Sequence, residues 1–207
     1  MDTDMDMDEV LERIARSLAA GQNGWPLTAP RQAFHRVGDL VVTREVGFAG
    51  LPLVEFVPLQ GVPPGRYPVH QHVVESGPDE DGAPSSWVNV TIVPLAGPRV
   101  IAEALEAGRA EDPIGDHQPF GPEAALWDEA ASELAWSDGF AERARSALAA
   151  AAAAGRVPNV LTVAAPSGDG AMCLVFPTGG DDEESARVTA LYDPGHRLAC
   201  LAFDQES

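Results

Sequence analysis

Residues 65–76 read GRYPVHQHVVES. The run opens with Gly65 and contains Tyr67 and three valines, which is typical of a β-strand. Because successive side chains of a strand point to opposite faces, His70 and His72 should leave the same face. The stretch therefore predicts a strand, and it raises the question of whether two neighbouring imidazoles hold a metal ion.

The strand pattern extends over two parts of the chain, residues 38–98 and residues 157–204. Runs of the same kind in the first part are DLVVTREVGF, LPLVEFVPL and SWVNVTIVPL. The second part contains VLTVAAP, AMCLVFP, ARVTALYD and RLACLAF. Gly and Pro clusters separate these runs, as between antiparallel strands.

Helices are expected at the start and in the middle of the chain. After an acidic tail over residues 1–8, apolar residues recur at helical spacing up to Leu18, which predicts an N-terminal helix. Residues 122–155 predict two central helices, one opened by Pro122 and an alanine-rich one that ends at Gly155. Residues 99–108 fit neither period. The order of elements predicts a single α+β domain over residues 1–207, with a largely antiparallel sheet or sandwich.

Charge restricts the classes of partner. The chain has 32 acidic residues against 13 arginines and no lysine, giving a formal net charge of −19. Such a surface disfavours nucleic acid and anionic lipid, and it favours association with a basic protein. No apolar run is long enough to span a membrane, so we expect a soluble cytoplasmic protein. Cys173 and Cys200 lie in apolar strand runs and are expected to be reduced core thiols.

The spacing around the two histidines approaches the first metal-binding motif of cupins. Gly65, His70, His72, Glu75 and Gly82 follow the order of that motif, with two spacings off by one residue. In a regular strand Glu75 points away from both histidines unless a bulge intervenes. A third nitrogen ligand would also be needed, with His196 or His117 as the candidates. The alternative, which we favour from sequence, places both histidines on the solvent face of the strand.

Other polar residues predict structure more readily than chemistry. His35 and His117 stand alone, and surface or half-buried positions are expected for both. Residues 166–172, PSGDGAM, predict a hairpin turn in which glycines supply positive φ. The acidic pair Asp128 and Glu129 and the acidic run over residues 181–184 predict solvated faces, because general acid catalysis would need a buried carboxyl group.

Three stretches resemble the DUF4241 family of uncharacterised bacterial proteins. Residues 64–69, PGRYPV, are similar to its strand-opening pGrYPV segment, and the middle region resembles one that ends in a short helix. Residues 167–172, SGDGAM, are similar to its sGxGDGxY hairpin, which leads to another strand and a final turn, here at Asp193 and Pro194. The resemblance covers roughly residues 38–195 and implies an α+β fold built around antiparallel strands. The chain departs from the family's VDxGxGxFxD stretch, of which only Phe120, Gly121 and Asp128 remain, and it lacks the tyrosine after GDG.

These observations leave three functions open. The first is a non-catalytic acidic protein-binding module of a bacterial cytoplasm, immunity-like or a scaffold, with a basic protein as partner and no cofactor. The second is a small metal-dependent, cupin-like enzyme using His70 and His72. The third is a structural component of an assembly.

Overall fold

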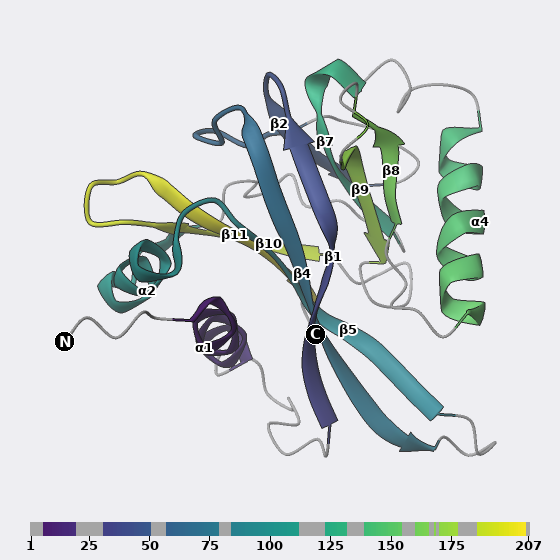
Figure 1. Ribbon diagram of the computed structural model, residues 1–207, viewed down its shortest axis with the longest axis horizontal. Coiled ribbons are helices and arrows are strands. Elements are labelled where there is room, and N and C mark those ends of the chain that lie inside the picture. Colours follow the sequence, from purple (N-terminus) through teal and green to yellow (C-terminus); the bar gives the residue numbers. More distant parts are fainter. Residues whose placement is uncertain are drawn as a thin grey trace.

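A computed structural model describes residues 6–19, 31–50, 57–78, 84–111, 123–131, 139–154, 160–165, 168, 170–177 and 186–205 of the chain (Figure 1). Three α-helices, a short 3₁₀-helix and eleven strands lie in these ranges. In chain order they are α1 (Met7–Ala19), β1 (Arg31–Val42), β2 (Val46–Gly50), β3 (Val57–Pro58), β4 (Gly65–Pro78), β5 (Pro84–Pro94), α2 (Pro98–Ala107), β6 (Ala110–Glu111), β7 (Glu123–Asp128), η1 (Glu129–Ala131), α4 (Phe140–Ala153), β8 (Val160–Ala164), β9 (Ala171–Pro177), β10 (Ala186–Tyr192) and β11 (Leu198–Gln205).

The strands form one large sheet in the order β3-β2-β7-β9-β1-β4-β5-β11-β10-β6, with β8 attached to β9. Neighbouring strands are antiparallel except for a parallel bridge between Leu40 of β1 and Ala171 of β9. This arrangement confirms the predicted α+β fold with a largely antiparallel sheet.

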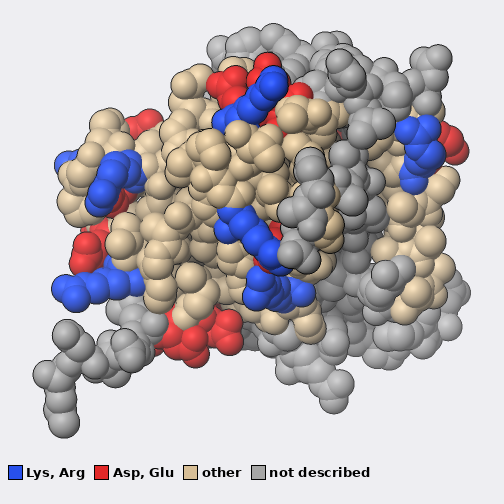
Figure 2. Space-filling view, turned by 45° about the horizontal axis from the view of Figure 1, so that its top comes forward, with Lys and Arg blue, Asp and Glu red and all other residues tan. Residues whose placement is uncertain are grey.

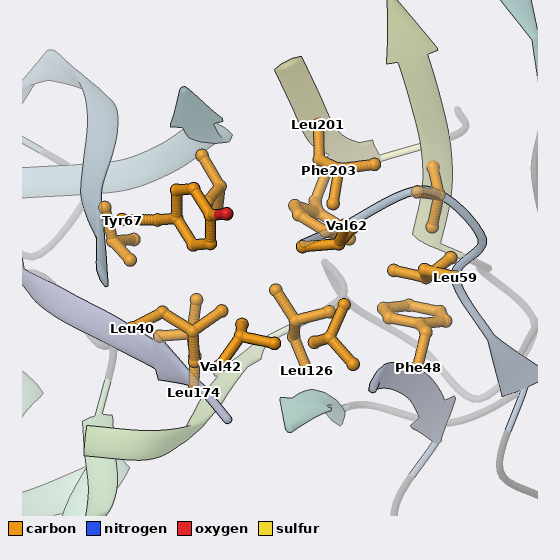
Figure 3. Packing of buried hydrophobic residues seen from close by; sticks show 14 of the residues in the cluster. Leu40, Val42, Phe48, Leu59, Val62, Tyr67, Leu126, Leu174, Leu201 and Phe203 are labelled. Atoms are coloured by element: carbon orange, nitrogen blue, oxygen red, sulfur yellow. The ribbon is translucent and has the colours of Figure 1, made fainter. Parts of the chain in front are cut away.

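The sheet curls so that its two halves face each other across the main hydrophobic core. Leu40, Phe48 and Leu126 come from the half that contains β2, β7 and β9, and Leu201 and Phe203 come from β11 in the other half. Figure 3 shows these side chains pointing toward one another. The rings of Phe48 and Phe203 stack with their centroids 5.7 Å apart. Burial of this inner face is the main force that closes the sheet.

Helices cover two parts of the outer face. Val10, Leu11 and Ile14 of α1 pack with Ile101 of α2 against apolar residues of β1, β5, β10 and β11. Helix α4 lies over β7, β8 and β9 at the other side of the molecule (Figure 1). The long central strands β1 and β4 pass between these two helical layers.

Three sequence predictions about helices have clear outcomes. The N-terminal helix and the alanine-rich helix are confirmed as α1 and α4, and the ambiguous residues 99–108 form α2 with Pro98 in its first turn and a left-handed Gly108 after its end. The helix predicted after Pro122 is wrong, because Glu123–Asp128 form strand β7. Residues 124–128 are all fully buried between β2 and β9, so sheet pairing on both sides overrides their alanine-rich helical preference.

Candidate functional site

The outer face of β4 carries both histidines of the opening stretch, and α1 covers this face. Val69 packs into the main core on the inner face of the sheet. On β5, the residue paired with His70 is Ile92 and the residue paired with His72 is Val90, and both of these pack beneath α1. The prediction that both histidines face solvent is therefore wrong. His72 is 4% exposed, and its ring centroid lies 4.8 Å from that of Phe34 on β1. Only His70 is half-exposed.

Strand β4 stays regular through the histidines. Its pairing with β1 runs without a shift from Glu75 opposite Arg31 to His70 opposite Arg36. A bulge does occur beside His72, but the extra residue, Asn89, belongs to β5. The two histidines therefore share one face, as alternation predicts. The side chain of Glu75 lies outside the described part of the structure.

No metal centre can be assembled from the described residues. No group of three or more His, Cys, Asp or Glu side chains lies close enough together among them to hold a metal ion. His196 is exposed in the turn between β10 and β11, where its φ is 64° and its ring packs beside Tyr192. His117, the acidic run 181–184 and Gly82 lie outside the described residues. The pairing of His70 and His72 with a metal remains a prediction from sequence.

Both imidazoles are held toward their neutral form. Burial lowers the pKa of His72 below its ordinary value of 6.5, against an opposing effect of the Glu12 carboxylate on α1. Burial and the positive charge of Arg36 lower the pKa of His70, while Asp8 and Asp39 oppose the shift. Between the histidines, Gln71 is fully buried and its Nε2 donates to Oγ1 of Thr91 at 3.0 Å.

Asp128 is a fully buried carboxylate, so its prediction as part of a solvated face is wrong. It accepts hydrogen bonds from the backbone N–H groups of Thr43, Arg44 and Ala130 and from the Thr43 hydroxyl. The neighbouring Glu129 is exposed, as predicted. Because four donors occupy the Asp128 oxygens, this residue ties the turn between β1 and β2 to the end of β7 rather than serving as an acid or base.

A second buried carboxylate, Asp39 on β1, was missed by the sequence reasoning. Its Oδ1 accepts from Nη2 of Arg36 and its Oδ2 from Nε of Arg66, both at 2.5 Å. We call Arg36, Asp39 and Arg66 the arginine–aspartate cluster. Burial alone would raise the pKa of Asp39, but the hydrogen bonds and charges of the two arginines hold it below its ordinary value.

Two segments that carry the family resemblance meet at this cluster. Arg66 belongs to the PGRYPV segment, and Gly170 ends the turn between β8 and β9. A Cβ atom at Gly170 would lie 2.8 Å from the carbonyl oxygen of Asp39, and the residue has φ 92°, so only glycine fits there. Gly168 also has positive φ, at 76°, which confirms the predicted hairpin turn. Ser167 and Asp169 lie outside the described residues.

The two cysteines are buried in the core, and Asp193 holds a turn together. Cys173 packs under α4 and Cys200 under α1 and α2, and both are free, buried thiols, as predicted. Burial raises the pKa of Cys173 to about 12 and also raises that of Cys200. In the turn after β10, Asp193 accepts hydrogen bonds from the backbone N–H and the guanidinium group of Arg197, which lower its pKa.

Comparison with known proteins adds no relative: no family model, no curated protein and no solved structure matches the chain. Within the described residues, none of the helices has the length and apolar character needed to cross a membrane.

Proposed function

We propose that this protein is a non-catalytic, acidic binding protein of a bacterial cytoplasm, immunity-like or a scaffold, and that its partner is a basic protein. The proposal includes membership of the DUF4241 family. A non-catalytic role is compatible with that membership, because the family has no settled activity. The proposal depends mainly on how the few cations of the chain are used.

The arginines are largely occupied within the protein itself. Seven of the ten arginine side chains that the structure describes form an ion pair with a carboxylate that it also describes: Arg13, Arg16, Arg36, Arg66, Arg99, Arg145 and Arg197. Figure 2 shows blue and red atoms in contact at several separate places on one face of the molecule. Arginines paired in this way contribute little net field, so the surplus of carboxylates dominates the surface potential.

Exposed carboxylates without such a partner occur on several elements. Glu9 on α1, Glu129 on η1 and Glu142 on α4 are exposed and form no ion pair with a described arginine. A basic partner would approach under long-range attraction and would lose affinity as salt screens it, because the Debye length falls to about 8 Å at physiological ionic strength.

The test begins by isolating proteins that bind the purified chain at low salt and remeasuring each with recombinant material. We expect a stoichiometric complex with a protein of high isoelectric point, whose association rate falls at least about tenfold between 50 and 500 mM salt, roughly as for electrostatically steered pairs. The single variants Glu9→Gln, Glu129→Gln and Glu142→Gln then map the face, because only the one at the interface should slow association. Exclusively neutral or acidic partners, or binding that is insensitive to salt, would contradict the proposal.

A further inference from the structure

Strand β5 extends well beyond the strand that pairs with its outer side. β11 pairs with β5 only from Pro94 to Val90, whereas β4 pairs with β5 as far as Pro84. In the order of the sheet the neighbours of β5 are β4 and β11, so among the described strands none pairs with the outer side of residues 85–89. Figure 1 shows this end of β4 and β5 projecting away from β10, β11 and α4. Alternate residues of such an edge direct their backbone N–H and C=O groups outward.

The other side of the same strands ends in β1, and that edge has features that prevent strand addition. On its side away from β4, β1 pairs with a described strand only through Leu40 and Ala171 of β9. The part of β1 before this bridge contains Arg31 and Arg36, and its register with β4 shifts between Arg36 and Gly38. Charged residues and bulges of this kind discourage another chain from pairing.

The open edge of β5 lacks these features over most of its length. Residues 85–89 read SSWVN, without a charged residue or a proline. The register of β5 with β4 runs without a shift from Ser85 to Val88, and the extra residue Asn89 lies where the pairing with β11 stops. A straight, uncharged edge that contains aromatic and β-branched residues is a template for pairing with another chain.

In the sequence, acidic residues flank this open edge at both ends. Asp204, the last β11 residue that pairs with β5, lies opposite Val90 and has Arg187 on its other side in β10. The acidic run 181–184 comes just before β10 begins, at this end of β11. At the opposite end of the edge, residues 79–81, DED, belong to the connection between β4 and β5. Basic side chains at the ends of an added strand would be attracted, whereas a second copy of this chain would bring acidic residues together.

We propose that the open edge of β5 binds an extended basic segment of the partner protein, which adds to the sheet as a further strand. The backbone ladder along residues 85–89 supplies the affinity, and the acidic residues at its ends select for basic side chains. This inference rests on the proposed function, since it names the part of the basic partner that is bound and the place that binds it.

The experiment titrates the isotope-labelled protein with the peptide Arg-Thr-Val-Thr-Val-Arg, blocked at both ends, and follows amide chemical shifts and hydrogen exchange. We expect saturable shifts at residues 85–89 and slower exchange of alternate amides there, with a dissociation constant of roughly 0.1 to 1 mM for a short unstructured strand. The matched peptide with glutamate in place of both arginines should bind at least about tenfold more weakly. Equal binding of the two peptides would overturn the selection for a basic segment.

Methylated peptides test the backbone ladder without altering the protein. N-methylation of both valines and N-methylation of both threonines block opposite edges of the peptide strand. Only one of these two edges can face β5, so one methylated peptide should bind at least about tenfold more weakly than the other. Equal affinities would show that no strand is added and would overturn the proposal.

A variant of the edge adds a test from the side of the protein. Ser86→Arg places a cation on the open edge and should weaken binding of the arginine peptide at least about threefold, because like charges on adjacent strands repel. Ser146→Arg adds the same charge at an exposed position of α4 and should bind as the original protein does. If Ser86→Arg does not fold, the two methylated peptides decide the question on the unaltered protein.

The remaining outcomes distinguish the edge from the proposed function. A basic partner protein that binds in a salt-sensitive way but leaves residues 85–89 unprotected would support the proposed function and overturn the binding at β5. Peptide binding at the edge, with no basic partner protein isolated, would support the edge and contradict the proposed function. Protection of the same amides that rises with protein concentration alone would assign the edge to a second copy and overturn the proposal.

Discussion

The two helical layers cover the same outer face of one sheet by opposite means. On the side of α1 and α2, the helices supply bulky residues, Val10, Leu11, Ile14 and Ile101, which pack onto Ala199 and Ala202 of β11 as well as Val90 and Ile92 of β5. On the side of α4, the sheet supplies bulk through Trp127 and Val175, and the helix contributes Ala144 with Phe140 and Leu148.

The difference shows where each layer gets its stability. A helix with alanine at its contact face approaches the sheet closely but buries little surface of its own, so its contribution depends on the strands beneath it. The bulky face of α1 buries more and also encloses a polar residue, His72. On the α4 side, we therefore expect stability to depend most on the strands and on the hydrogen bonds that join them. On the α1 side, we expect stability to depend most on the helix itself and to change with pH.

The largest effect on stability is expected for Asp128, at the end of β7, one of the strands that α4 covers. Asp128→Ala would leave three backbone N–H groups and the Thr43 hydroxyl without their buried acceptor. The free energy of unfolding should fall by about 4 kcal/mol, the scale of breaking a buried charged network. Urea denaturation followed by tryptophan fluorescence measures it, with Glu129→Ala as the exposed control that should change by less than about 0.5 kcal/mol. Equal losses in the two variants would contradict the assigned role of Asp128.

The next largest effect is expected in the α1 layer. Ile14→Ala removes a side chain that is 1% exposed and leaves a cavity between the helix and the sheet. Unfolding free energy should fall by about 3 kcal/mol, within the range for buried Ile→Ala changes. Hydrogen exchange should show that amides of α1 lose more protection than those of α4. Ser17→Ala, at an exposed position of the same helix, should leave exchange unchanged; a uniform loss over both helices would argue against a separate α1 layer.

A smaller effect is expected for the corresponding truncation in α4. Leu148→Ala removes a residue that is 7% exposed and has alanines beside it on the helix. Because the alanine-rich face packs against the sheet with little bulk, we expect a loss of about 2 kcal/mol, at the low end for buried Leu→Ala. The same urea experiment measures it, with the exposed Ala149→Gln as control. A loss as large as that of Ile14→Ala would remove the contrast between the layers.

Local pattern was sufficient for much of the fold. The antiparallel sheet, α1, α4 and the turn around Gly168 follow from periodicity and from the backbone freedom of glycine, which are local properties. Strand β7 could not be found in this way, because its alanines favour a helix and only pairing with β2 and β9 makes it a strand.

The site residues were less accessible from sequence for a related reason. Alternation correctly placed His70 and His72 on one face, but it could not show that α1 covers that face, since this depends on packing between distant segments. Asp39 and Asp128 look like ordinary charged residues in the chain, and no spacing marks them. Their burial and their partners from other strands become visible only in the folded structure.

The smallest effect, and the one specific to the α1 side, is a dependence on pH. The pKa of His72 is lower in the folded protein than its ordinary value of 6.5, so the unfolded chain binds more protons in acid. Stability from this group is complete above about pH 6.5 and is lost as the pH falls from there toward the folded pKa. Phe34 packs beside the ring, Val90 is its cross-strand neighbour on β5, and the Glu12 carboxylate opposes the pKa shift.

His72→Phe keeps an aromatic ring against Phe34 but cannot take up a proton. Urea denaturation at about pH 7 and pH 5.5 should therefore show a greater loss for the original protein than for His72→Phe. His35→Phe removes an exposed imidazole from the neighbouring strand and should lose stability with acid as the original protein does. If His72→Phe also follows the original protein between these two pH values, the buried imidazole does not distinguish the α1 layer from the α4 layer.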